Sequence, residues 1–259
     1  MIDKETLQDL AKEMKIDLFT VFREYLQLVF LKYFYSQKES EKVYFKGGTA
    51  LRFLFGSFRF SEDLDFTSIL SERKLKTLIE KTLQDLNKEV GEISFKEEGT
   101  ITDAFTGRIF QKIPEFNFPL TIRLDFSLRE KPFLIETSYI ETIFPVGSFP
   151  QVSHLKIEEL MTEKVRAVLT RNKGRDIFDL YFLLSKHILI DWELVNKKMA
   201  LYEKTADIQK LIQAINEFPQ GEIRNDLTKF LPLTHRSLVE KIKELTLEKL
   251  FKILSFLFI

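Results

Sequence analysis

The chain has 259 residues, enough for one large domain or two smaller ones with a substantial buried core. Its 39 Lys and Arg residues equal its 39 Asp and Glu residues, so no strong overall field steers it onto nucleic acid, and any such contact requires a local basic patch. The absence of Cys excludes disulfides, thiolate nucleophiles and Cys-ligated metals.

The two ends of the chain bear on its location. The charged N-terminal residues carry no signal-peptide pattern. The apolar run at 250–259 is shorter than the about 20 residues that a membrane span needs. We therefore expect a cytoplasmic protein.

The first part of the chain predicts alternating helices and strands. Apolar residues at three- and four-residue spacing, such as Leu18, Val21 and Phe22, predict one helix over residues 3–37. The elements expected next are a short strand at 43–45, a helix that starts at residue 49 or 50 and ends at 55, a strand at 61–66 and an amphipathic helix at 72–90.

Strands dominate the next segment, which ends near residue 144. They are expected at 92–95, 104–110, 120–128 and 139–144. The clearest is 120–128, where polar and apolar residues alternate, with Arg123 and Asp125 among the polar ones. Such a strand buries one face and presents the other to a cleft or to solvent.

Helices alone are expected after residue 147. Their predicted ranges are 155–170, 176–186, 191–202, 206–217 and 234 to the end. The expected fold is therefore α+β, with an α/β domain at 1–148 followed by a helical domain at 149–259. Because no low-complexity linker separates the two, we expect them to pack together.

Asp63 and Asp65 are the first candidate catalytic residues. Carboxylates at i and i+2 of a strand share a face, about 7 Å apart, so both can reach one pair of Mg²⁺ or Mn²⁺ ions. Two such ions can orient an attacking hydroxyl and stabilise a departing pyrophosphate. Asp125 is the expected third carboxylate, and Ser61 lies just before the pair. A lone Asp-x-Asp pair is common by chance, so the surrounding residues determine whether this pair predicts a metal site.

The segment upstream of this pair predicts a phosphate cradle. Gly47 and Gly48 let main-chain N–H groups approach a phosphate closely, and a helix that begins near Thr49 adds its positive end. The side chains of Arg52 and Arg59 either bind phosphate or neutralise the Asp pair. Together these residues predict a nucleotide site.

The run at residues 46–66, KGGTALRFLFGSFRFSEDLDF, resembles the signature of the AbiEii-type nucleotidyltransferase toxins, a branch of the DNA polymerase β-like nucleotidyltransferase superfamily. The commoner superfamily pattern has Gly-Ser closer to Asp-x-Asp, whereas Gly-Gly-Thr stands further upstream here, as is usual in the AbiEii branch. Gly56-Ser57 lies too close to Asp63 to leave room for the helix. The resemblance implies a polymerase β-like core with a mixed sheet and a C-terminal helical domain.

A second block, residues 159–180, resembles the downstream motifs of the same family. By that resemblance Lys164 binds the triphosphate and contributes to the cleft, and either Asp179 or Asp176 is the later acidic residue. A cation there offsets charge on the transferring nucleotide. On one continuous helix Lys164 and Arg171 would share a face, so both could approach the phosphates.

Ordinary structural roles explain some of these residues equally well. Gly174 could end one helix, with Asp176 near the start of the next, where a carboxylate suits the helix dipole. Arg175, a further candidate for the site, could form a surface ion pair with Asp179, four residues later. The sequence leaves both interpretations open.

The resemblance implies the toxin of a toxin–antitoxin or phage-defence system, with a separately encoded antitoxin. The leading hypothesis is metal-dependent transfer of an NMP from an NTP to a hydroxyl of RNA, typically tRNA, with Asp125 or a metal assisting deprotonation of that hydroxyl. One alternative keeps the chemistry but has a small molecule or a protein side chain as acceptor. Another is a non-catalytic nucleotide-binding module, which two crowded carboxylates disfavour.

Overall fold

The computed structural model describes residues 2–257, apart from residues 102, 115, 148 and 172. The chain forms two compact units, Met1–Leu155 and Lys156–Ile259. The division falls later than the boundary expected at residue 148, because strand β7 (Val152–Leu155) belongs to the sheet of the first unit.

Two helices, α1 (Lys4–Met14) and α2 (Leu18–Tyr35), open the first unit. Lys15 ends α1 in the left-handed conformation, with φ of 55°. The side chain of Asp17 then accepts a hydrogen bond from the main-chain N–H of Thr20 and caps α2. The prediction of one helix over 3–37 is wrong, because apolar spacing continues across a break that these two residues create.

The first unit contains a seven-stranded mixed sheet in the order β3-β4-β5-β2-β1-β7-β6. Strand β2 pairs antiparallel with β1 and parallel with β5, and β5 pairs antiparallel with β4. The strands other than β7 are β1 (Val43–Lys46), β2 (Asp63–Ser68), β3 (Ile93–Ile101), β4 (Ala104–Gln111), β5 (Leu120–Ser127) and β6 (Ile135–Ser138). The expected α+β class with a mixed sheet is confirmed.

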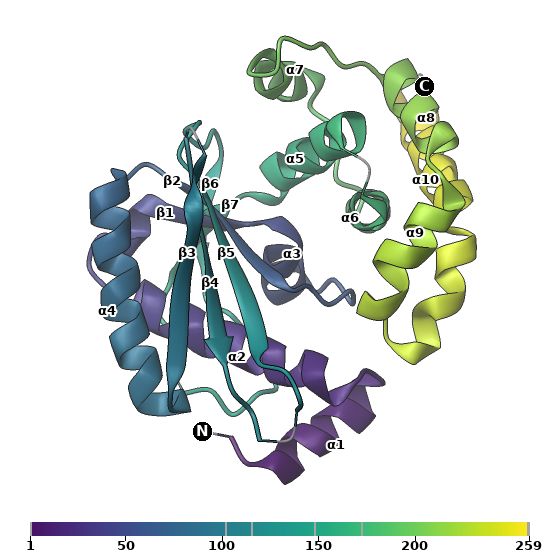
Figure 1. The fold of residues 1–259 in the computed structure, drawn as a ribbon. Coiled ribbons are helices and arrows are strands. Elements are labelled where there is room, and N and C mark those ends of the chain that lie inside the picture. Colours follow the sequence, from purple (N-terminus) through teal and green to yellow (C-terminus); the bar gives the residue numbers. More distant parts are fainter. Residues whose placement is uncertain (1, 102, 115, 148, 172, 258–259) are drawn as a thin grey trace. The chain divides into compact units, whose positions relative to one another are not determined.

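Helices α2 and α4 (Glu72–Val90) contact each other and cover one face of this sheet (Figure 1). The ring of Phe34 on α2 lies 5.4 Å from that of Phe66 on β2, and Phe66 stacks on Phe126 of β5 at 4.7 Å. Because side chains alternate along a strand, Asp63 and Asp65 lie on the opposite face. The aromatic core thus fixes which face carries the carboxylates.

The structure contradicts the strand expected at residues 139–144. Strand β6 ends just before that segment and pairs with β7. Because β7 lies after residue 147, the expectation that only helices follow that residue is also wrong. Three of the four residues of β6 are exposed, and all four of β7 are buried, including the polar His154. Neither strand shows the apolar alternation by which a strand is recognised in a sequence.

The second unit is helical, as expected, and α6 contacts α5, α9 and α10 within it. Its α-helices are α5 (Ile157–Thr170), α6 (Gly174–Ser185), α7 (Trp192–Ala200), α8 (Ile208–Glu217), α9 (Gln220–Leu227) and α10 (Ile242–Leu257). Short 3₁₀ helices occur at Ser40–Lys42 in the first unit and at Thr228–Phe230 and Leu233–Glu240 in the second. No helix among the described residues has both the length and the apolarity needed to cross a membrane.

Candidate active site

Three carboxylates lie on the sheet face opposite α2 and α4. Asp63 and Asp65 share one face of β2, and Asp125 lies on the polar face of β5. The parallel pairing of these strands places Asp65 directly opposite Asp125. Because neighbouring strands are about 4.8 Å apart, the backbone brings the three predicted carboxylates to one place on the sheet.

Helix α3 (Gly47–Phe55) begins directly after β1, two residues before its earliest expected start at Thr49. Gly47 has φ of +81°, a conformation that L side chains rarely adopt. A Cβ atom on Gly47 would lie 2.1 Å from Oδ2 of Asp65. The missing side chain therefore lets the carboxylate of Asp65 rest against the main chain at the start of α3, where helix N–H groups are available.

Replacing Gly47 with Ala should displace the Asp65 carboxylate and lower the catalytic rate at this site by about 100-fold, since a misplacement of about 1 Å has that effect in other active sites. The matched control is Gly56→Ala, because Gly56 has a similar φ of +76° and open space where the new Cβ would lie. We expect both variants to lose some thermal stability but only the first to lose most of its activity. Equal activity losses would show that the contact with Asp65 is unimportant.

The other residues of the predicted phosphate cradle make contacts that connect the start of α3 to the segment leading into β2. The hydroxyl of Thr49 donates a hydrogen bond to the main-chain carbonyl of Asp63 (2.5 Å). A Cβ on Gly48 would lie 2.0 Å from Nη2 of Arg59, whose side chain is buried and donates from Nη1 to the carbonyl of Phe60 (2.8 Å). Gly48 thus gives Arg59 room beside the start of α3.

The side chain of Arg52 pairs with a glutamate of helix α2 and not with Asp63 or Asp65. Its guanidinium binds the carboxylate of Glu24 on α2 through two nitrogens and lies 3.6 Å from the ring centroid of Phe60. This ion pair links α2 to α3 and accounts for Arg52 without a phosphate. Ser61 lies just before β2, where its main-chain carbonyl accepts a hydrogen bond from Gln27 (3.2 Å).

Two arginines border the carboxylates on the β4 side. Nη2 of Arg123 lies 3.5 Å from Oδ2 of Asp125, and Nε of Arg108 donates a hydrogen bond to Glu98 (2.7 Å). That hydrogen bond lowers the pKa of Glu98. The sequence did not single out Arg108, Arg123 or Glu98 as site residues, because half-buried charges on strands follow no motif.

The donor chemistry at this place suits hard divalent cations. Within the described residues, no three Asp, Glu, His or Cys side chains are arranged to hold a metal ion as they stand. The register nevertheless places three carboxylates on adjacent strands, and Gly47 leaves space beside Asp65. Carboxylate oxygens are the ligands that Mg²⁺ and Mn²⁺ prefer.

In the second unit Lys164 forms a buried ion cluster with two acids of α6. Its Nζ lies 2.7 Å from Oδ2 of Asp179 and 3.1 Å from Oδ1 of Asp176, and these three residues are at most 6% exposed. Arg171 binds Asp176 through Nε (2.7 Å) and Nη2 (3.0 Å). Burial opposes ionisation of Asp176, but the charges of Lys164 and Arg171 outweigh it and lower the pKa of this carboxyl.

Several expectations for this block need correction. Helix α5 ends at Thr170, so Arg171 is extended and does not share a helical face with Lys164. Arg175 pairs with Asp226 (3.1 Å) and not with Asp179, which rules out the surface pair considered above.

Gly174 begins α6 instead of ending a helix, and a Cβ there would lie 2.6 Å from Cα of Ile223 on α9. The interpretation of Asp176 as a residue near a helix start is correct. Participation of Lys164 and Asp179 in one site with the carboxylates of the first unit stays a prediction.

The acids of this cluster should make the second unit sensitive to acid. The pKa of Asp176 is lower in the folded chain than the about 3.9 of an unfolded Asp. Its contribution to stability is therefore complete above about pH 5, where an unfolded Asp is fully ionised, and is lost as the pH falls towards the folded value. We expect the free energy of unfolding to decline between pH 5 and pH 3.

Urea unfolding at several pH values would measure this decline. Asp176→Asn should flatten it and lower stability at neutral pH, whereas Glu248→Gln, at an exposed site of the same unit, should change neither. An unchanged pH profile in the Asn variant would show that Asp176 is not responsible.

A mixed sheet that carries three carboxylates on adjacent strands, beside a helix that begins with glycine, is the arrangement expected of a nucleotidyltransferase. The chain belongs to the AbiEii family, because the family model described as "Nucleotidyl transferase AbiEii toxin, Type IV TA system" matches residues 29–249. This confirms the resemblance seen in the sequence. Membership in a type IV toxin–antitoxin family also implies an antitoxin as partner.

Solved structures share the fold at low sequence identity. MenT4, a nucleotidyltransferase toxin from Mycobacterium tuberculosis, is 17% identical with a TM-score of 0.59, covering 96% of this chain and 90% of that one. JHP933 from Helicobacter pylori is 21% identical with a TM-score of 0.56, covering 93% and 97%. A putative nucleotidyltransferase from H. pylori is 21% identical with a TM-score of 0.53, covering 90% and 97%. A comparison with curated proteins gave no match.

Proposed function

We propose that this protein transfers an NMP from an NTP to a hydroxyl of RNA, with tRNA as the expected acceptor, and that Asp63, Asp65 and Asp125 bind two Mg²⁺ or Mn²⁺ ions for this reaction. The observation that carries the proposal is the strand register, which sets Asp65 opposite Asp125 with Asp63 on the same face. Carboxylates on adjacent strands repel one another unless cations offset their charge, so their grouping favours a site for divalent ions in addition to the arginine beside Asp125.

The chain's own groups have distinct parts in this reaction. Main-chain N–H groups at Gly47 and Gly48 bind phosphate oxygens of the NTP. Asp125 orients the acceptor hydroxyl and assists removal of its proton. A bond forms between the acceptor oxygen and the α-phosphorus, the bond from that phosphorus to the bridging oxygen breaks, and pyrophosphate leaves. Divalent ions supply Lewis-acid stabilisation of the charge on the transferred group.

The proposal is tested by incubating the purified chain with each of the four α-labelled NTPs, total RNA and Mg²⁺ or Mn²⁺. We expect covalent label in RNA, concentrated in the tRNA fraction. Label on a small molecule or on protein would replace RNA as the acceptor. The absence of label with every NTP and both metals would contradict the proposal.

A further inference from the structure

A row of basic side chains crosses the sheet on the face that carries the carboxylates. The register sets Lys96 on β3 opposite Arg108 on β4, Arg108 opposite Arg123 on β5, and Arg123 opposite Asp63 on β2. Directly opposed residues of a sheet share a face. Lys96, Arg108 and Arg123, here named the cationic row, therefore lead from Asp63 to the outer strand β3.

The carboxylate of Glu98 interacts with two members of this row. It accepts a hydrogen bond from Arg108 (2.7 Å) and lies 3.6 Å from Nε of Arg123. That nitrogen is enclosed and has no hydrogen-bond partner in the described part of the chain. Glu98 sits where β3 shifts register, between Glu97 and Gly99. Arg123 also lies 3.5 Å from Asp125, at the end of the row nearest the carboxylates. The guanidinium groups of Arg108 and Arg123 are about one-third and two-fifths exposed, and such groups suit anionic phosphate oxygens.

The position of the row indicates which reactant it meets. In the sheet order, β1 and Gly47 lie on one side of Asp65, and β5, β4 and β3 lie on the other. If the glycines hold the phosphates of the NTP, the acceptor approaches from the side of the row. Three strands place the outer cations about 10 Å apart, which is room for more than one phosphate of a nucleic-acid strand, since the charges of one strand recur about every 3.4 Å along the helix axis.

We propose that the cationic row binds backbone phosphates of the acceptor RNA and leads its hydroxyl towards Asp125. Glu98 holds Arg108 and Arg123 in place until a phosphate replaces it. This inference rests on the proposed function and specifies how its acceptor is bound.

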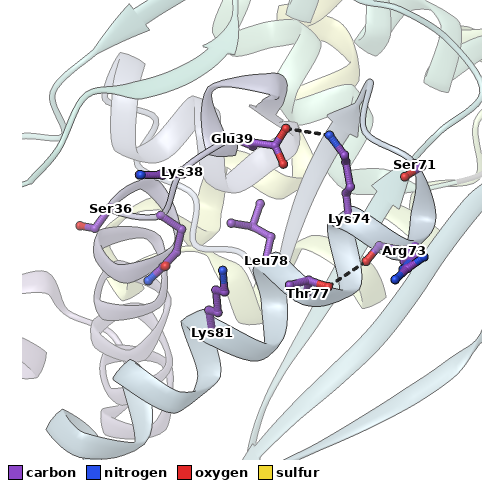
Figure 2. Close-up of a pocket in the computed structure, with 10 residues that line it drawn as sticks. Ser36, Lys38, Glu39, Ser71, Arg73, Lys74, Thr77, Leu78 and Lys81 are labelled. Atoms are coloured by element: carbon purple, nitrogen blue, oxygen red, sulfur yellow. Dashed lines mark hydrogen bonds and ion pairs between the residues drawn. The ribbon is translucent and has the colours of Figure 1, made fainter.

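A second basic surface provides a rival site and a matched control. A recess of about 750 Å³ lies between the end of α2 and the first turns of α4, on the helical side of the sheet. Figure 2 shows Lys38, Arg73 and Lys81 around it, and Lys74 paired with Glu39 (2.9 Å). The first three are exposed and make no ion pair within the described residues. Their charge resembles that of the row, but they lie on the face opposite the carboxylates.

The test compares two double variants with the same loss of charge, Arg108→Gln/Arg123→Gln in the row and Arg73→Gln/Lys81→Gln at the recess. For the row variant we expect the KM for RNA to rise about tenfold or more with the KM for NTP unchanged. The recess variant should behave as wild type. If instead only the recess variant binds RNA weakly, or neither variant does, the proposal is overturned.

RNA binding without turnover separates this inference from the proposed function. In an Asp65→Asn background, fluorescence anisotropy at several salt concentrations should show a salt slope smaller by about 1.4 for the row variant, at about 0.7 for each lost phosphate contact with a single strand. Binding through the row without any labelling of RNA would contradict the function and leave the row standing. If the row variant labels RNA with an unchanged KM for RNA, the proposed function stands and RNA binding by the cationic row is rejected. Failure of the wild-type chain to bind RNA would also reject RNA binding by the cationic row.

Two single variants test the same surface with less risk of unfolding the chain than the double variant carries. Lys96→Gln alters an exposed side chain and should weaken RNA binding about twofold to fivefold. Glu98→Gln removes the competing carboxylate and should tighten RNA binding. A purely structural Glu98 would give unchanged or weaker binding, so a gain in affinity is the outcome that a structural role does not produce.

Discussion

Asp65→Asn should abolish nucleotide transfer, reducing its rate by about 1,000-fold or more, equivalent to about 4 kcal/mol in the barrier. The amide keeps the size of the side chain but removes the negative charge that binds a divalent ion. Asp65 is half-buried beside Gly47, and the main chain of β2 is held by its neighbouring strands, so the fold should persist. Loss of one of three crowded carboxylates should leave thermal stability unchanged or slightly raised.

The rate of label transfer and the melting temperature of the same preparation would test this. Glu80→Gln, at an exposed position of α4, removes one carboxylate from the helical layer and should retain full activity. An Asp65→Asn variant that melts like wild type and keeps more than a tenth of its activity would exclude Asp65 from the catalytic set.

Lys164→Ala should destabilise the second unit by about 3–5 kcal/mol, which is the usual cost of removing one partner from a buried ion pair. Asp176 and Asp179 would keep their charges in the interior without the ammonium group that lies within 3.1 Å of both. Urea unfolding would measure the loss. Lys173→Ala, at an exposed position just before α6, is the control and should have little effect.

A second substitution separates this structural role from the role that the family resemblance gives to Lys164. Adding Asp179→Asn to Lys164→Ala removes one of the stranded charges and should recover part of the stability. If Lys164 also binds the triphosphate, activity should stay low in the restabilised chain. Recovery of activity together with stability would show that Lys164 acts through folding alone.

The carboxylates were predictable because their signal is local. Alternation along residues 61–66 and 120–128 shows that Asp63, Asp65 and Asp125 lie on the polar faces of strands. The same alternation limits the register of each strand, since a slip of one residue would bury the Asp side chains. The sequence thus contained the essential geometry of the predicted metal site.

Other features depend on pairings between distant segments. Arg52 meets Glu24, 28 residues away, and nothing in the sequence distinguishes this partner from the nearby Asp pair. Arg171 lies on no helix, because α5 ends at Thr170, and no glycine or proline at that point marks the helix end in the sequence. The cationic row depends on the register of β3 against β4, which shifts at Glu98. These contacts come from tertiary packing rather than from local periodicity.

Nucleotidyl transfer requires that the chain release one pyrophosphate for each nucleotide that the RNA gains. The most direct test is one reaction with RNA, Mg²⁺ and NTP labelled in parallel at the α- and γ-phosphates, from which RNA and free phosphates are separated. We predict α-label in RNA, γ-label in pyrophosphate in equal amount, and neither with Asp65→Asn. Recovery of γ-label in RNA, or of pyrophosphate in the absence of any labelled acceptor, would contradict nucleotidyl transfer by these carboxylates.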